Sequence, residues 1–191
     1  MKNQSLIEVL FRFYGVLYVF IYIGFILLIS LAHSSINIIS ILAILVPFIS
    51  LLLFVLVLSK SKYLNISSER KTKNKLKHIA MIGSIPTIVC MVMLGINEYK
   101  SSFNTNRWLT SLSERVYMVD NLLSTYDLKG KTKSEVIELL GAPTDTGYFK
   151  TKTNIVYYLG NERGLISIDS EWLVIDFDEG ERVVNYSVRT D

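Results

Sequence analysis

Histidine and cysteine, which many enzymes use as bases, nucleophiles or metal ligands, are absent from the C-terminal half of this 191-residue chain. Both histidines, His33 and His78, and the single cysteine, Cys90, lie in the first half. Ser-His-Asp or Cys-His catalysis and zinc sites built from His and Cys are therefore excluded from residues 97–191. One cysteine also excludes a disulfide within the chain, and its apolar surroundings favour a buried thiol among helices.

Carboxylates are the remaining candidates for chemistry. Asp169 and Glu171 flank one serine, and Asp176 and Asp178 are two residues apart, so each pair lies on one side of an extended strand. A glycosidase needs two carboxyl groups across a cleft, one of them with a raised pKa. The spacing favours solvated turns and strand ends. A carboxylate-dependent hydrolase that acts on envelope polysaccharide is kept as a third alternative.

Two stretches of the sequence invite comparison with ion-binding loops, and neither has the residue spacing that such a loop requires. The stretch "DFDEGE" begins like a calcium loop, but Gly180 falls at its fifth position and Ser187 stands at position twelve, where a glutamate is needed. Phosphate-cradling glycine loops are absent, because "GAPTDTG" is a helix stop followed by a turn. We therefore predict no metal, no cofactor and no enzymatic activity.

Aromatic residues with an arginine suggest a binding surface instead. Tyr157 and Tyr158 point to opposite faces of a predicted strand, Trp172 follows on another strand, and Arg163 lies in the turn between them. Exposed aromatics beside an arginine are typical of hot spots in protein interfaces. We predict that these four residues bind a partner, with the alternative that they cover the sheet's own edges or contact the membrane spans.

Two helices are predicted to open the C-terminal domain. The first is amphipathic, with Arg115 off its apolar stripe, and the stripe recurs at Trp108, Leu112, Val116, Val119 and Leu123. The second begins at Thr132, where Glu135 completes a capping box, and ends at Gly141, before Pro143. Its apolar face consists of Val136, Leu139 and Leu140. A helix this short must pack on other elements to be stable.

An antiparallel sheet of about four strands is predicted to complete an α+β domain. The β-rich runs are 153–160, 164–170, 171–177 and 182–188, and a further short strand is expected around 147–150. Alternation places Leu173, Ile175 and Phe177 on one face and Trp172 on the other. In the last strand the predicted buried face consists of Val184, Tyr186 and Val188.

The stretch "LKGKTKSEVIELLGAP", followed by "YYLG" and "WLVIDFDEGERV", resembles the BamE (SmpA/OmlA) and β-lactamase-inhibitor-protein-like (BLIP-like) superfamily of small extracytoplasmic domains. The matching positions are Leu128, Gly130, Thr132, Glu135, Val136, Leu139, Leu140, Gly141 and Pro143. The resemblance covers residues 104–190 and implies two helices on an antiparallel sheet. BamE-type proteins are anchored by a lipidated cysteine, whereas here Val89 precedes Cys90 and no lipobox is present.

Three predicted spans provide the anchor in this chain. Residues 13–31 and 36–58 carry no charge, and each is long enough to cross a ~30 Å hydrocarbon core as a helix. Residues 78–96 form a weaker third span with Gly83 and Pro86 near its middle. We expect a membrane domain over residues 1–96, a linker over 97–103 and the α+β domain over 104–191.

The distribution of charge predicts the orientation. Residues 59–77 carry seven Lys and Arg against one Glu, and residues 32–35 carry none. By the positive-inside rule the N-terminus and the loop 59–77 are cytoplasmic, and the C-terminal half is extracytoplasmic. The same basic loop could also bind anionic lipid. Neither half shows the basic and aromatic surface of a nucleic-acid-binding protein.

These observations predict a multi-pass protein of the bacterial plasma membrane that presents an extracytoplasmic protein-binding domain. Its predicted partners are the lipid bilayer and another envelope or membrane protein. The main alternative is an accessory or sensory subunit, whose spans bind another membrane protein through small residues such as Gly15, Gly24 and Gly83.

Overall fold

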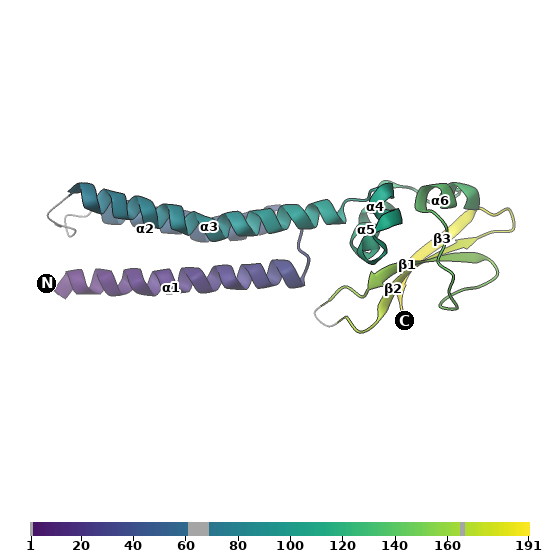
Figure 1. Ribbon diagram of the computed structural model, residues 1–191, viewed down its shortest axis with the longest axis horizontal. Helices are drawn as coiled ribbons and strands as arrows, with labels where there is room; N and C mark the ends of the chain where they lie inside the picture. The colour runs from purple at the N-terminus through teal and green to yellow at the C-terminus, as the bar shows by residue number, and fades with distance from the viewer. Residues whose placement is uncertain (1, 61–68, 165–166) are drawn as a thin grey trace. The chain divides into compact units, whose positions relative to one another are not determined.

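The computed structural model describes residues 2–60, 69–164 and 167–191, and the chain divides into two compact units, Met1–Asn97 and Glu98–Asp191 (Figure 1). We refer to them as the N-terminal unit and the C-terminal unit. Of the predicted loop 59–77, residues 61–68 lie outside the described residues, whereas residues 59–60 and 69–77 are helical.

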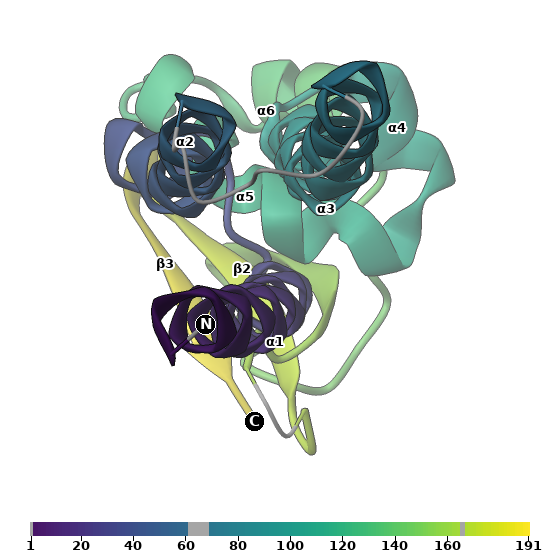
Figure 2. The same cartoon turned by 90° about the vertical axis from the view of Figure 1, so that its left-hand side faces the viewer.

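The N-terminal unit consists of three long helices, α1 (Lys2–Leu31), α2 (Ile38–Lys60) and α3 (Glu69–Ser101). Seen end-on in Figure 2, they form a three-cornered bundle. Each contains a stretch long and apolar enough to cross a membrane, and these stretches are Val9–Leu31, Ile38–Val57 and Leu76–Ser101. Three candidate membrane-spanning helices are consistent with a membrane protein. The last helix continues through most of the predicted linker.

Tyrosine hydroxyls fasten the bundle where proline weakens a helix. Proline lacks an N–H, so the carbonyl four residues before it loses its helical donor, and the steric clash of the ring with that carbonyl loosens the preceding turn. In α2, the hydroxyl of Tyr22 donates to the carbonyl of Ile44, three residues before Pro47, at 2.7 Å. The same hydroxyl lies 2.9 Å from the hydroxyl of buried Thr87 on α3. One tyrosine thus links all three helices.

The same device recurs one turn earlier along α1. The hydroxyl of Tyr18 donates to the carbonyl of Gly83, again three residues before a proline, Pro86, at 2.5 Å. Gly83 is also a point of close contact between α3 and α2, since a Cβ added there would lie 2.3 Å from the Cδ2 atom of Leu51. Glycine at this position therefore serves packing inside the chain.

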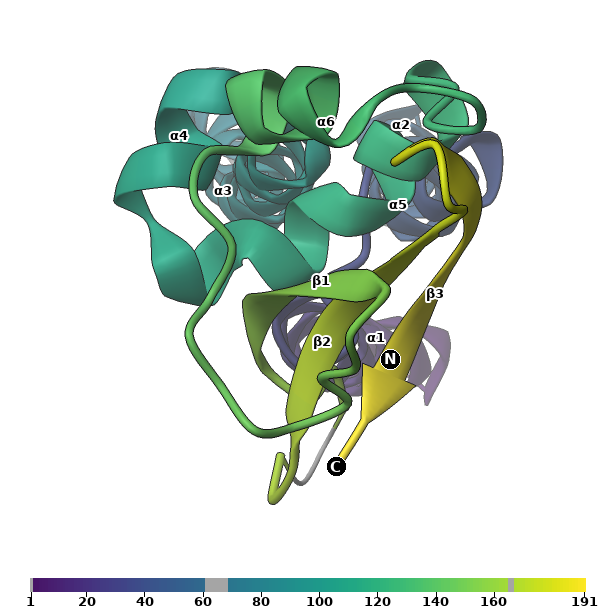
Figure 3. The same cartoon turned by 90° about the vertical axis from the view of Figure 1, so that its right-hand side faces the viewer.

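The C-terminal unit contains short helices and one sheet. The helices are α4 (Thr105–Thr110), the 3-10 turn η1 (Leu112–Glu114), α5 (Arg115–Thr125) and α6 (Lys133–Leu140), and the strands are β1 (Asn154–Asn161), β2 (Ser170–Phe177) and β3 (Val183–Thr190). The strands form an antiparallel sheet in the order β1-β2-β3. Figure 3 shows the helices beside the sheet and the long connection from α6 to β1 looping around it.

One core joins the helices to the sheet. Its fully buried side chains come from α4, α5 and α6 and from one face of β1 and β2, and they include Trp108, Met118, Leu122, Leu140, Tyr157, Leu173 and Ile175. The Trp108 indole donates to the Leu140 carbonyl at 3.1 Å, so this residue also ties α4 to the end of α6.

The capping predicted for the second helix is confirmed. The Thr132 hydroxyl accepts from the Glu135 amide at 3.3 Å, and the Glu135 carboxylate accepts from the Thr132 amide at 2.7 Å. Gly141 ends α6 with a φ of 78°, in the region that favours glycine. Val136 and Leu140 are buried, as the apolar face predicted.

The prediction of one continuous first helix is wrong, because the structure has α4, η1 and α5 in its place. The chain leaves helical geometry at Ser111, whose φ and ψ are −116° and 73°, and the phase of the apolar stripe shifts there. As a result Leu112 is exposed, and Leu122 rather than Leu123 is fully buried. Arg115, predicted to lie off the stripe, is only 5% exposed.

The sheet has three strands rather than about four. Because Asn161 of β1 pairs with Ser170 of β2, the segment between them is the loop of a hairpin and adds no strand among its described residues. The short strand expected around 147–150 is a turn with Phe149 at a φ of 54°. A bulge near the start of β3 also changes the predicted inward face there, so Val183 is buried and Val184 exposed.

The capping box predicts a pH-dependent stability of the C-terminal unit. Hydrogen bonds from the backbone and hydroxyl of Thr132 lower the pKa of Glu135 below its usual range. The group therefore contributes stability above its ordinary pKa of about 4.3, and this contribution is lost as the pH falls through the lower folded value. Glu135→Gln should make the fall in unfolding free energy below about pH 4.5 shallower.

This can be measured by denaturant unfolding of the full-length protein, because both tryptophans, Trp108 and Trp172, report on the C-terminal unit. Glu138→Gln, on the same helix but outside the capping box, is the matched control and should keep the wild-type pH dependence. The same slope for all three proteins would contradict this role of the capping box.

Candidate partner-binding surface

The two neighbouring tyrosines of β1 lie on opposite faces of the sheet, as predicted. Tyr157 is fully buried in the main core, and its hydroxyl donates to the Gly141 carbonyl at 2.9 Å. Burial raises the pKa of this phenol, and the charge of Arg115 offsets only part of that effect. Tyr158 is half-buried on the other face. Tyr157 therefore presents no surface to a partner.

Trp172 is also covered, which corrects the expectation of an exposed hot spot. It is 6% exposed and belongs to a small second-face cluster with Val156 and Val174. The Tyr148 ring stacks on it at 5.3 Å between centroids, and the Tyr158 ring meets it edge-on at 5.1 Å. The connection between α6 and β1, which carries Tyr148, thus covers this face of the sheet.

The Trp172 indole N–H is buried and has no hydrogen-bond partner among the described residues. A buried donor left unpaired in this way costs about 1–3 kcal/mol relative to a paired one. The aromatic packing around Trp172 must therefore more than offset this cost. Its immediate role in the fold is to hold the α6–β1 connection against the sheet.

Arg163 fastens the β1–β2 hairpin to α5. Its guanidinium donates to both carboxylate oxygens of Glu171, at 3.1 and 2.9 Å, and to Asp120 at 2.5 Å. Burial works against the charged form, but the two carboxylates outweigh it and raise the pKa of Arg163. The Glu171 side chain is only 7% exposed, so this arginine neutralises a buried charge.

Arg115 closes the outer edge of β1, a role that sequence reasoning did not find. Its guanidinium donates to the Trp108 carbonyl at 2.7 Å and to the Tyr158 carbonyl at 3.3 Å, and it lies 5.0 Å from the centre of the Trp108 ring. Burial lowers its pKa, and the nearby Tyr157 offsets part of this shift. An arginine beside an apolar stripe carries no signal of such burial.

The α6–β1 connection completes the closure of this edge. The Thr144 amide donates to the Val156 carbonyl at 2.8 Å, and the Tyr158 amide donates to the Thr144 hydroxyl at 2.9 Å. Farther along β1, a Cβ added to Gly160 would lie 2.7 Å from the Ser113 carbonyl oxygen, so η1 sits directly against the strand. The Val156 carbonyl and the amide and carbonyl of Tyr158, on the outer edge of β1, therefore have partners within the chain.

The outer edge of β3 is different. The Asp191 amide donates to the Ser170 carbonyl, which fixes the phase of the antiparallel ladder. By alternation, the backbone groups of Tyr186, Val188 and Thr190 point away from β2. No hydrogen bond within the described part of the chain reaches these groups, whereas Val183 at the start of β3 pairs with residues 130–131.

This edge also lacks the usual protection against strand pairing. Native edges are commonly shielded by lysine, proline, bulges or short length. In β3 the bulge lies at the beginning and the one charged residue, Arg189, near the end, so residues 184–188 carry neither charge nor proline. Tyr186 and Val188 lie half-buried beside this edge on the face of the main core. The arrangement can accept an added strand, with backbone hydrogen bonds and an apolar flank.

Two of the four carboxylates considered for hydrolysis serve other purposes. Glu171 is paired with Arg163, and Asp178 accepts from the amides of Gly180 and Arg182 in the β2–β3 turn. Within the described ranges, no group of three or more His, Cys, Asp or Glu side chains is placed to hold a metal ion.

Comparison with known proteins finds no match, either among protein-family models, among curated proteins or among solved structures.

The buried ion pair predicts an asymmetric effect of two substitutions. Arg163→Ala leaves the Glu171 carboxylate buried without its partner and should lower the free energy of unfolding by about 2 kcal/mol, less than for a fully buried pair because a third of Arg163 is exposed. Asp120→Asn keeps the Glu171 pair and should change stability by less than about 0.5 kcal/mol. Equal effects in denaturant unfolding would contradict this assignment.

The second-face cluster predicts that Trp172 stabilises the fold, whatever it contributes to binding. Trp172→Ala removes a nearly buried ring and should lower the free energy of unfolding by about 3 kcal/mol. Tyr148→Ala removes a ring that is 55% exposed and should cost about 1 kcal/mol or less. A Trp172→Ala protein with the wild-type denaturation midpoint would show that the cluster has no structural role.

Proposed function

We propose that this chain is a bacterial multi-pass plasma-membrane protein whose C-terminal unit binds another envelope protein outside the cytoplasm, without catalysis of its own. The anchor consists of the three apolar helices. The basic loop between the second and third spans favours a cytoplasmic N-terminus. After three crossings, the C-terminal unit then lies on the extracytoplasmic side.

The open edge of β3 is the observation that carries this proposal. An extended segment of a partner can pair with the free backbone groups of Tyr186 and Val188 and thereby add a fourth strand. Backbone hydrogen bonds would supply the affinity, and contact with the half-buried side chains of Tyr186 and Val188 the selectivity. The proposed binding site is therefore the β3 edge and not the sheet face around Trp172.

The resemblance to BamE-like and BLIP-like domains supports a role in protein binding. It rests on "LKGKTKSEVIELLGAP", whose Thr132, Glu135 and Gly141 act as caps of α6. Because most of these positions stabilise the fold, they support the kind of domain more strongly than any particular partner.

An accessory subunit that binds a membrane protein through its spans is the second candidate. Of the glycines that could allow a close helix contact, Gly83 is occupied by Leu51 within the chain. A Cβ added at Gly15 or Gly24 would meet nothing within 4 Å, so these two positions could admit a helix from a partner.

Site-specific photo-crosslinking tests the edge-strand proposal. A photoreactive amino acid at Thr190, next to the open backbone groups, should give one discrete adduct with another protein in cells that express the full-length chain. Val188→Pro should abolish this adduct, since proline removes an outward N–H while edge strands tolerate it. Val188→Thr keeps that N–H and a β-branched shape, and should retain the adduct.

The same photoreactive residue at exposed Glu138 on α6 is the positional control and should give no such adduct. An adduct from Glu138 equal to that from Thr190, or one that persists in Val188→Pro, would contradict docking at the β3 edge. An adduct of twice the mass of the chain would replace the proposed partner by a second copy and overturn the proposal of another protein.

A further inference from the structure

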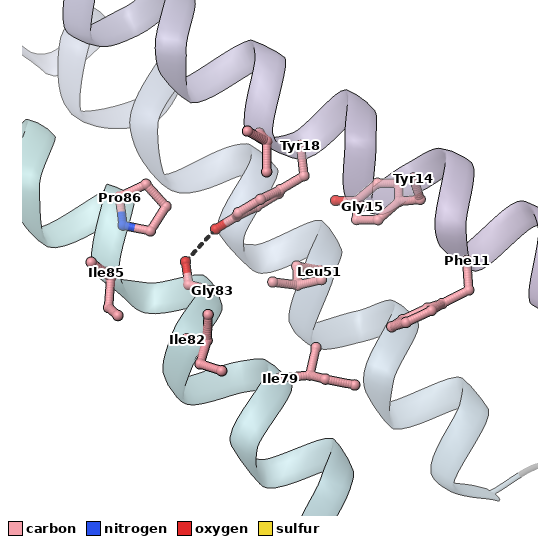
Figure 4. Close-up of a pocket in the computed structure, with 11 residues that line it drawn as sticks. Phe11, Tyr14, Gly15, Tyr18, Leu51, Ile79, Ile82, Gly83, Ile85 and Pro86 are labelled. Atoms are coloured by element: carbon pink, nitrogen blue, oxygen red, sulfur yellow. Dashed lines mark hydrogen bonds between the residues drawn. The ribbon is translucent and has the colours of Figure 1, made fainter.

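A groove runs between the helices of the N-terminal unit. Its volume is about 470 Å³ (Figure 4). The residues that line it come from α1, α2 and α3 and include Phe11, Tyr14, Gly15, Tyr18, Val19 and Pro86. The volume lies within the range of about 300–1,000 Å³ that is typical of small-molecule sites.

The groove offers hydrocarbon and no free polar group. Tyr14 and Tyr18 carry the two hydroxyl groups in its lining. The Tyr18 hydroxyl donates to the Gly83 carbonyl, as Figure 4 shows, and the Tyr14 hydroxyl contacts the Pro47 carbonyl at 3.1 Å and the Ser50 hydroxyl at 2.5 Å. With these hydroxyls satisfied inside the bundle, an occupant of the groove must be apolar.

The length of the groove covers most of the depth of one leaflet. On α1 its lining extends from Phe11 to Val19, and on α3 from Ile79 to Pro86. At 1.5 Å per residue these stretches measure about 10–12 Å. They begin near the first residues of the candidate spans Val9–Leu31 and Leu76–Ser101, so the groove runs from one membrane boundary towards the middle of a ~30 Å core.

One cation lies at the boundary end of the groove. Arg12 is exposed. It is three residues before Gly15 and seven before Val19, and therefore lies on the side of α1 that lines the groove.

We propose that this groove binds one acyl chain of an anionic glycerophospholipid, whose phosphate group contacts Arg12. An acyl chain satisfies the apolar lining and extends into one leaflet, and an anionic headgroup neutralises the cation at the boundary. A basic residue near the cytoplasmic membrane surface attracts such headgroups. This inference is independent of the β3 edge, since it uses residues of the N-terminal unit alone.

The test uses the full-length protein in nanodiscs made from phosphatidylglycerol and phosphatidylcholine, with native mass spectrometry of the lipid retained after release. The wild-type chain should retain phosphatidylglycerol in preference to phosphatidylcholine. A Cβ added at Gly15 would meet nothing within 4 Å, so Gly15→Leu places its side chain in the groove and should lose this lipid. Gly24→Leu is the matched control, because it adds the same side chain to open space on the same helix outside the groove, and should retain it.

Charge variants separate the headgroup from the acyl chain. Arg12→Gln should reduce retention of phosphatidylglycerol about fivefold, as expected for a basic residue that contributes about 1 kcal/mol, whereas Arg12→Lys should retain it. Soluble glycerol phosphate, which lacks the acyl chain, should not displace the lipid.

Equal retention by Gly15→Leu and Gly24→Leu would overturn the proposal, as would equal retention of the two lipids by the wild-type chain. Displacement of the lipid by glycerol phosphate would show that the site binds an anion without an acyl chain, and would overturn the proposal. Release of a lipid-free dimer from the wild-type chain, but not from Gly15→Leu, would assign the groove to a helix of a second copy instead.

Discussion

The need to satisfy backbone hydrogen bonds organises both halves of this chain. In a hydrocarbon core no water can replace a missing partner. The tyrosine hydroxyls of α1 donate to carbonyls in the turns that precede Pro47 and Pro86, and in doing so they join the three helices. In the C-terminal unit the backbone groups that need partners are the outward N–H and C=O groups at the two edges of a three-stranded sheet. Arg115 and Thr144 meet it at β1, whereas the described chain supplies no partner for the outer groups of β3 beyond Val183.

Because of this difference between the edges, the C-terminal unit can accept an added strand at β3 but not at β1. Its helices cover one face of the sheet, and the α6–β1 connection covers the aromatic cluster on the other. The Arg163–Glu171 pair holds the β1–β2 hairpin in place. With both faces and one edge closed, the free edge of β3 is the place where backbone pairing can still extend the structure. The N-terminal unit has a comparable incomplete surface, where an apolar groove lies beside exposed Arg12.

Local chemistry was predictable from the sequence, and long-range arrangement was not. The capping box of Thr132 and Glu135 depends on neighbours three residues apart, and the three apolar helices depend on length and composition, so both could be predicted. The alternation that separates Tyr157 from Tyr158 was equally local. The burial of Trp172 was missed because its covering residue, Tyr148, comes from a connection without a periodic pattern. The role of Arg115 and the open edge of β3 depend on strand order, which a single sequence does not reveal.

Hydrogen exchange at the individual amides of β3 tests the central claim most directly. It would be measured on the full-length protein in nanodiscs and in membrane vesicles from cells that express it. In nanodiscs, the amides of Tyr186 and Val188 should exchange rapidly, while those of Ser187 and Arg189, which face β2, should be protected. In native membranes the first pair should become protected as well. Unchanged rapid exchange of Tyr186 and Val188 in native membranes would contradict the binding of a partner strand at this edge.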